Sequence, residues 1–245
     1  MTENGQLNIF DLFTAEFWAK LYAQVRRSTI SPIQNFEFNI LKAKVLHATS
    51  QELDTIWPKV VGKMPKSDKN LADIGFALYY VYAEQALVSA VSASEVYFKD
   101  TLAYAIQNDK RLLNRYVDKE IKVKRILEID MDLSENIGML IVEKMNFQNL
   151  DTVQNEYKKL FGFEPFANKE LNELKKIFAI RHAIIHKSGI VDHLFISKTG
   201  LDYKVGSKLF FERDKILQMI EFIEKIVTKS DSMLTEKLSF GELTP

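Results

Sequence analysis

The chain contains no cysteine, and this absence excludes disulfide bonds, thiolate metal sites and a cysteine nucleophile. Glycine and proline are also scarce, at 9 and 5 of 245 residues. Because turn-rich β proteins need many of both, their scarcity favours helices. A chain without cysteine is compatible with a reducing compartment, and we expect a cytoplasmic protein.

Excess charge and long hydrophobic runs are missing as well. Lysine and arginine together number 33 and balance 33 acidic residues, so any binding to nucleic acid must use a local patch. The first residues show no basic segment followed by an apolar run, so we expect no signal peptide. The longest apolar stretch, 76–91, is interrupted by Glu84 and Gln85, which predicts a buried helix and no membrane span.

Several well-known catalytic signatures are absent from the sequence. It has no glycine-rich phosphate-binding loop, no Gly-x-Ser-x-Gly elbow and no protein-kinase motif set. It also shows no internal repeat and no low-complexity tract. The common nucleotide-binding and serine-hydrolase classes are therefore not indicated.

What the chain does contain is helical spacing of apolar residues, which make up 47% of it. An all-α fold is therefore predicted, with a helix start at Ser31-Pro32 and a left-handed cap at Gly189. Residues 194–205, with Gly200 in the middle, instead suggest a short β-hairpin or an extended loop. The predicted helices span about 9–27, 32–47, 50–58, 70–108, 110–115, 120–128, 134–145, 151–161, 168–187 and 213–237.

A polar segment at residues 62–69 contains both Gly62 and Pro65. Such a segment is typical of a boundary between structural units. We therefore predict an N-terminal helical extension over residues 1–65 and a main helical domain over residues 66–245.

The most informative stretch is Arg181-His182-Ala183-Ile184-Ile185-His186, near the end of the helix predicted over 168–187. Arg181 occupies a position on the apolar stripe where another Leu or Ile would be expected, and a buried arginine keeps its charge. It must therefore meet an anion or border a cleft. Histidine is the side chain best suited to proton transfer near neutral pH. The stripe consists of Leu171, Leu174, Ile177, Phe178, Ile184 and Ile185.

Two other interpretations of this stretch remain open. Because five residues of helix rotate His186 by about 140° from Arg181, Arg181 could pair with a core carboxylate while His186 only caps the helix. Alternatively, His182 and His186 have the spacing of a helical metal pair, with His193 or Asp192 as a third ligand. No glutamate follows His182, so the zinc-protease pattern fails, and we expect neither a metal nor another cofactor.

A dense run of basic residues offers a second candidate feature. It contains Lys110, Arg111, Arg115, Lys119 and Lys122. The run is either a solvated helix surface or a positively charged surface that binds a nucleic-acid backbone. Tyr116, within the run, is either a core residue or a side chain that stacks against a base.

The motif resembles the Arg-x4-6-His signature of the HEPN superfamily, with Arg181, a polar residue, a hydrophobic pair, His186 and then Lys-Ser-Gly. Residues 93–100 resemble the early helix of that family, and residues 203–206 with the closing helix resemble the segment after its motif. The resemblance covers about 70–238. It implies a small α-helical bundle that dimerises across the motif.

The resemblance also implies an activity, that of a metal-independent endoribonuclease such as a toxin or a phage-defence effector. Arg181, His186 and His182 would be catalytic, and Lys187 with the basic run would bind RNA. RNA would be the substrate, and a second copy of the chain would be the dimer partner. An antitoxin protein would be a further partner. The alternative, from another class, is a non-catalytic helical interaction or scaffold protein in which the Arg-His pair is structural.

The buried guanidinium of Arg181 needs a counter-charge in either case. Glu95 and Asp100, on the predicted helix 70–108 that is rich in small residues, are the first candidates, and Glu84 is a third. Ordinary surface acids remain the alternative interpretation of all three.

Overall fold

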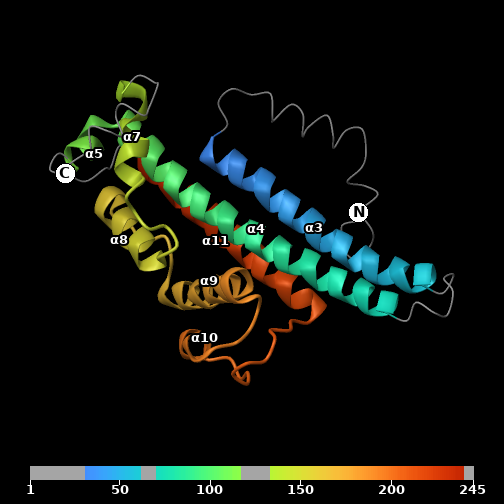
Figure 1. Ribbon diagram of the computed structural model, residues 1–245. Helices are drawn as coiled ribbons and strands as arrows, with labels where there is room; N and C mark the ends of the chain where they lie inside the picture. The colour runs from blue at the N-terminus through green and yellow to red at the C-terminus, as the bar shows by residue number, and fades with distance from the viewer. Residues whose placement is uncertain (1–30, 62–69, 117–132, 240–245) are drawn as a thin grey trace, which may run out of the picture. The chain divides into compact units, whose positions relative to one another are not determined.

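In a computed structural model, residues 31–61, 70–116 and 133–239 are described. They form eight α-helices, drawn in chain order from blue to red in Figure 1. Within these ranges no β-strand occurs, and the only sheet-like pairing is an isolated antiparallel bridge between Ile190 and Lys208. The prediction of an all-α fold is confirmed. The helices are α3 (Pro32–Val61), α4 (Asn70–Asn108), α5 (Lys110–Asn114), α7 (Leu133–Val142), α8 (Leu150–Phe161), α9 (Asn168–Lys187), α10 (His193–Thr199) and α11 (Arg213–Ser239).

The prediction of two helices over 32–47 and 50–58 was wrong, because α3 is a single helix. Ser50 does not cap a new helix. Its hydroxyl donates a hydrogen bond of 2.6 Å to the carbonyl of His47 inside the helix, as serine commonly does mid-helix. The start of α3 is as predicted, since the Ser31 hydroxyl accepts from the Gln34 N–H while the Gln34 side chain accepts from the Ser31 N–H.

Three predictions fall outside the described residues. They are the helices over 9–27 and 120–128 and the boundary segment at 62–69. The chain does divide into two compact units, Met1–Ala93 with Lys175–Lys225, and Ser94–Leu174 with Ile226–Pro245. The division into 1–65 and 66–245 stays a prediction, since the segment on which it depends is not described.

The first unit has a core of small and branched apolar residues. On α4, Ala86, Leu87 and Ala90 are fully buried, so the apolar stretch 76–91 contributes to a protein core as expected. An ion pair of 2.6 Å between Lys44 and Glu224 connects α3 to α11. In the described ranges, no helix combines the length and the apolar character needed to cross a bilayer.

The second unit has an aromatic core. Phe98 makes edge-to-face contacts with Tyr157 and Phe166 at ring-centroid distances of 5.6 and 5.3 Å. The Tyr97 hydroxyl donates a 2.9 Å hydrogen bond to Asp231 on α11. These contacts join α4, α8 and α11 through buried rings.

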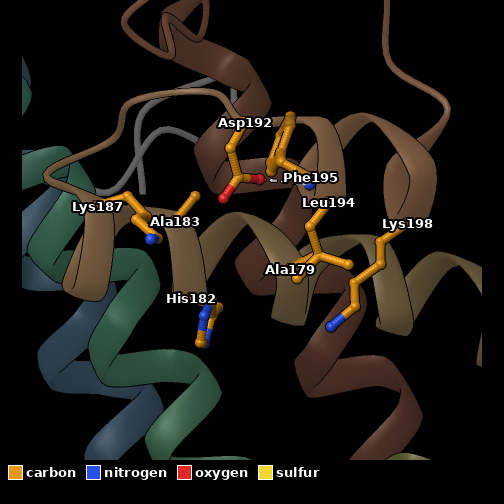
Figure 2. Close-up of a pocket in the computed structure, with 8 residues that line it drawn as sticks. All are labelled: Ala179, His182, Ala183, Lys187, Asp192, Leu194, Phe195 and Lys198. Atoms are coloured by element: carbon orange, nitrogen blue, oxygen red, sulfur yellow. Dashed lines mark hydrogen bonds between the residues drawn. The ribbon is translucent and has the colours of Figure 1, made fainter. Parts of the chain in front are cut away.

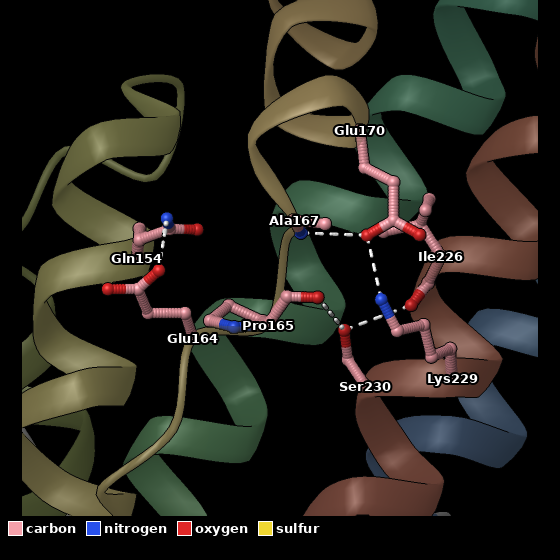
Figure 3. A network of polar contacts seen from close by, with 8 residues as sticks. All are labelled: Gln154, Glu164, Pro165, Ala167, Glu170, Ile226, Lys229 and Ser230. Atoms are coloured by element: carbon pink, nitrogen blue, oxygen red, sulfur yellow. Dashed lines mark hydrogen bonds and ion pairs between the residues drawn. The ribbon is translucent and has the colours of Figure 1, made fainter.

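A polar network fixes the start of α9 in this unit (Figure 3). The Glu170 carboxylate accepts from the Ala167 N–H at 2.8 Å and from the Lys229 ammonium at 2.7 Å. The Ser230 hydroxyl lies 3.3 Å from the Pro165 carbonyl and 2.9 Å from that of Ile226. Glu170 therefore satisfies a free N–H before the first turn of α9 and at the same time pairs with a lysine of α11.

The predicted β-hairpin is wrong, because Leu194–Ser197 lie in the helix α10. Asp192 begins this helix by accepting a 2.7 Å hydrogen bond from the Phe195 N–H, and Gly200 ends it in a left-handed conformation. Residues 200–212 follow as an irregular segment that contains the Lys208 end of the bridge. Local capping at both ends of α10 outweighs the β propensity of its apolar residues.

Candidate functional site

Arg181 lies on the core-facing side of α9. It follows Ile177 by one turn and precedes Ile184 by one turn, and both isoleucines are buried. Arg181 itself is half-buried, and its Nε atom is shielded from solvent. The predicted stripe needs correction, since Ile185 is 43% exposed and Phe178 is only half-buried, whereas Ile180 and Ala183, which were not predicted, are buried.

His182 and His186 form a contacting pair on the exposed side of the same helix. Both residues are exposed, and their ring centroids lie 4.5 Å apart with an interplanar angle of 43°. Spacing of four residues brings two side chains onto one face of an α-helix, so the sequence is sufficient to predict this contact. The site therefore presents two imidazoles to solvent one turn apart.

The surroundings of His182 are electropositive. Partial burial lowers the pKa of His182 below its ordinary value of 6.5, and electrostatic repulsion by His186, Lys198, Arg181 and Lys187 lowers it further. Each of these neighbours disfavours the protonated imidazolium. The lowered pKa of His182 therefore favours the neutral imidazole at pH 7.

A small pocket of about 30 Å³ opens beside His182, between α9 and α10 (Figure 2). Its wall is apolar, and the charged residues Lys187, Asp192 and Lys198 lie among its lining residues. Within the described ranges, neither lysine ammonium forms a hydrogen bond or an ion pair. The lining residues are Ala179, His182, Ala183, Lys187, Asp192, Leu194, Phe195 and Lys198.

The end of α9 is closed by its backbone, as predicted for Gly189. Gly189 has φ +74° and its N–H donates a 2.9 Å hydrogen bond to the Ala183 carbonyl, which is typical of a left-handed helix end. Ser188 before it also has a positive φ, of 51°. In the described part of the chain the His186 ring forms no hydrogen bond, so the capping role that was the alternative for His186 belongs to the backbone.

The three acidic residues predicted as counter-charges of Arg181 differ in their contacts and in the compact unit to which they belong. Glu84 forms an ion pair of 3.6 Å with Lys208. Glu95 and Asp100 belong to the second compact unit, whereas Arg181 belongs to the first, so their pairing with Arg181 stays a prediction. Burial raises the pKa of Asp100 above its usual value, and Lys99 opposes this.

The basic run is partly neutralised within its own unit. The Arg111 guanidinium donates three hydrogen bonds to the Asp109 carboxylate, Nε–Oδ1 at 3.1 Å, Nε–Oδ2 at 3.3 Å and Nη2–Oδ2 at 2.8 Å, and these lower the pKa of Asp109. Arg115 donates to the Lys159 carbonyl, and Lys110 is exposed. Lys119 and Lys122 lie outside the described residues, and Lys187 belongs to the other unit.

Tyr116 is a core residue. It is 4% exposed, its hydroxyl binds Glu156, and the Lys159 ammonium lies 4.3 Å from its ring centroid. The suggestion that Tyr116 stacks on a base is therefore wrong. Among the described residues, no group of three His, Asp or Glu side chains is placed to hold a metal ion, so His193 and Asp192 do not complete a site with the histidine pair.

Sequence reasoning missed Lys198, which the hairpin prediction placed in a turn. Two signals could have found it. Asp192 is a favourable N-cap and Gly200, eight residues later, a favourable C-terminal stop. A helix between them turns Lys198 toward α9.

Comparison with known proteins provides no further assignment. The chain matches no model of a known protein family, and no characterised protein or solved structure shows significant similarity to it.

Proposed function

We propose that the protein is a metal-independent endoribonuclease of the HEPN type. The observation that carries the proposal is the exposed His182–His186 pair, whose rings lie 4.5 Å apart on the turn that also carries half-buried Arg181. A cation and two proton carriers on one helix end are what phosphodiester cleavage without a metal requires. The lysines at the adjacent pocket add positive charge for an anionic substrate.

The reaction can be assigned to these side chains with its atoms balanced. The ribose 2′-oxygen attacks phosphorus while its proton passes to His182, which suits a general base because its lowered pKa keeps it neutral at pH 7. The bond from phosphorus to the 5′-oxygen breaks, and His186 gives that oxygen a proton. Arg181 lies on the core-facing side of α9, but its charge acts on His182, and in the proposed step it stabilises the charge of the pentacoordinate phosphorus from that side. The products are a 2′,3′-cyclic phosphate and a 5′-hydroxyl.

The setting we propose is that of a cytoplasmic toxin or phage-defence effector that works as a homodimer across the motif and is neutralised by an antitoxin. Two large apolar side chains near the motif support a protein contact there, since Ile185 is 43% and Leu194 55% exposed. The same two residues favour the second candidate function, a helical interaction protein without catalysis.

Cleavage of RNA in the presence of EDTA separates the two candidates. We expect Arg181→Ala and His186→Ala each to lower kcat/KM by roughly 10²- to 10⁴-fold, the usual contribution of a positioned acid or base. His193→Ala is the matched control, because His193 is exposed, lies in the same unit and does not line the pocket. It should retain full activity. DNA should not be cleaved because it lacks the 2′-hydroxyl.

Circular dichroism of each variant must show the helical content of the parent protein. RNA cleavage that is absent from the parent, or that is unchanged in a folded His186→Ala variant, contradicts the nuclease. Activity that EDTA abolishes and zinc or manganese restores contradicts the metal-free mechanism. If both motif variants unfold, the motif is structural and the interaction protein is favoured.

A further inference from the structure

We infer that the pocket between α9 and α10 is a phosphate-binding subsite, in which Lys187 and Lys198 hold a phosphate of the RNA chain next to the one that is cleaved. The inference rests on the proposed function and extends it to the substrate, since it requires an RNA with at least one phosphate beside the scissile one. It assigns a substrate-binding role to Lys198, which belongs to none of the motifs in the sequence.

The charges around the pocket favour an anion. Figure 2 shows the ammonium groups of Lys187 and Lys198 on either side of His182, with Lys187 extending from the end of α9 and Lys198 from α10. In the described part of the chain, neither ammonium has an ionic partner. Both are close enough to oppose protonation of His182. Two uncompensated lysines beside one imidazole form a local positive potential.

One lining group opposes this, the carboxylate of Asp192. One of its oxygens, Oδ1, is already occupied by the Phe195 N–H at 2.7 Å. Two lysines face this single carboxylate, so the net charge of the lining residues remains positive. Asp192 therefore lowers the affinity for an anion without reversing the preference.

The size of the pocket restricts what can enter. Its volume of about 30 Å³ is that of roughly two water sites. A nucleobase is too large, whereas the oxygens of a phosphate can lie in it while the rest of the nucleotide remains outside. The wall is formed by Ala179, Ala183, Leu194 and Phe195, which offer no competing hydrogen bonds from their side chains.

The position of the pocket identifies the source of the phosphate. His182 both lines the pocket and contacts His186, so a phosphate held there lies beside the one at the histidine pair. Neighbouring phosphates of this kind are present along a single RNA strand. Lysines suit the task because they bind phosphate as point charges and tolerate different backbone geometries.

The test measures the His182 imidazole by NMR during pH titrations, with inorganic phosphate or uncleavable 2′-O-methyl RNA as the probe. Either probe should raise the pKa of His182 in the parent protein. Lys198→Gln should raise the pKa of His182 without a probe, because one opposing charge is removed. It should also weaken RNA binding by roughly fivefold, as expected for one exposed charge contact. The slope of log affinity against log salt should become shallower by about 0.7.

Lys204→Gln is the matched control, since Lys204 is an exposed lysine of the same unit that does not line the pocket. It should leave both the pKa of His182 and the salt slope unchanged, and Lys198→Arg should restore binding. Equal effects of Lys198→Gln and Lys204→Gln overturn the subsite. If inorganic phosphate raises the pKa of His182 but Lys198→Gln leaves the affinity for RNA unchanged, the pocket binds phosphate and its assignment to an RNA phosphate is overturned.

The failure of the subsite and that of the proposed function can be distinguished, because the probes are not cleaved. Lys198-dependent binding in a protein that cleaves no RNA supports the subsite and contradicts the nuclease. Cleavage with a kcat/KM that Lys198→Gln leaves unchanged supports the nuclease and overturns the subsite. If both hold, Lys198→Gln raises KM more than it lowers kcat.

Discussion

At the scale of single residues, the neighbouring atoms decide what a substitution does. Gly138 in α7 lies against α4, where its N–H donates a 3.0 Å hydrogen bond to the Gln107 side chain. A Cβ atom at this position would lie 2.1 Å from the Ala103 carbonyl oxygen. No real Cβ approaches a backbone oxygen so closely, so the two helices would have to separate.

Gly138→Ala should therefore lower the free energy of unfolding by about 1–3 kcal/mol, the usual range for overpacking. In an open helix the same change would instead add about 1 kcal/mol. Denaturant unfolding followed by circular dichroism measures the difference. Met139→Ala next to it, at a 41% exposed position, is the control and should change stability by less than about 0.5 kcal/mol. A stabilised Gly138→Ala protein would contradict the close approach of α7 and α4.

The contact between the two histidines and the half-burial of Arg181 could be predicted from sequence at this scale, but the surroundings of these residues could not. The contact between His182 and His186 follows from helix geometry alone, because residues four apart share a face. The half-burial of Arg181 follows from its place among apolar residues. Lys198 could not be placed near them, because its position depends on the packing of α10 against α9.

At the scale of elements, the residues at helix ends determined which predicted helix bounds were confirmed. The bounds of α4 and α9 were predicted as they are, since the apolar periodicity ends where Asp109 caps the next helix and where Gly189 adopts a left-handed conformation. At Ser50 and at 194–197 the local signal was ambiguous. Serine can cap a helix or bond back into one, and a short apolar run fits a strand or a helix.

Asp192 offers a test at the scale of α10, because its carboxylate both begins the helix and lines the pocket. Asp192→Ala should cost about 1 kcal/mol of unfolding free energy, since the Phe195 N–H loses its acceptor. Asp192→Asn keeps an acceptor oxygen and should cost less. It also removes the only negative charge among the pocket residues, so it should bind inorganic phosphate more tightly than the parent protein. Thermal unfolding and phosphate titration check both effects. Equal stability of the two variants would contradict the capping role, and a phosphate affinity of Asp192→Asn no higher than that of the parent protein would contradict the role in the pocket.

At the scale of the whole molecule, buried tyrosines limit stability at high pH. Burial, with the charge of Asp214, raises the pKa of Tyr79 to about 12 from an ordinary value of 10.0. Burial likewise raises the pKa of Tyr97, Tyr116 and Tyr157. Tyr79 belongs to the first unit and the other three to the second, so both units contain a phenol that resists ionisation.

The sign of the effect is set by proton linkage. Above pH 10 the unfolded chain loses phenolic protons that the folded protein retains, so the free energy of unfolding decreases between pH 10 and about 12. The chain contains nine tyrosines, so we expect only the last part of the phenolate absorbance to appear together with the loss of the helical signal in this range. Tyr97→Phe removes one of the buried phenols and should shift the transition to higher pH. Formation of all nine phenolates near pH 10 with intact helices would contradict the burial of these four side chains.

The division of the chain has a practical consequence. Each compact unit is built from two separate stretches of sequence, and the divisions fall inside α4, α9 and α11. No single cut of the polypeptide releases either unit intact. Separating the units would require cuts inside these helices, and each cut would leave part of the helix without its packing partners. Limited proteolysis should accordingly yield no small fragment that retains the histidine pair in folded form, and functional dissection of this protein must proceed by substitution instead of by deletion.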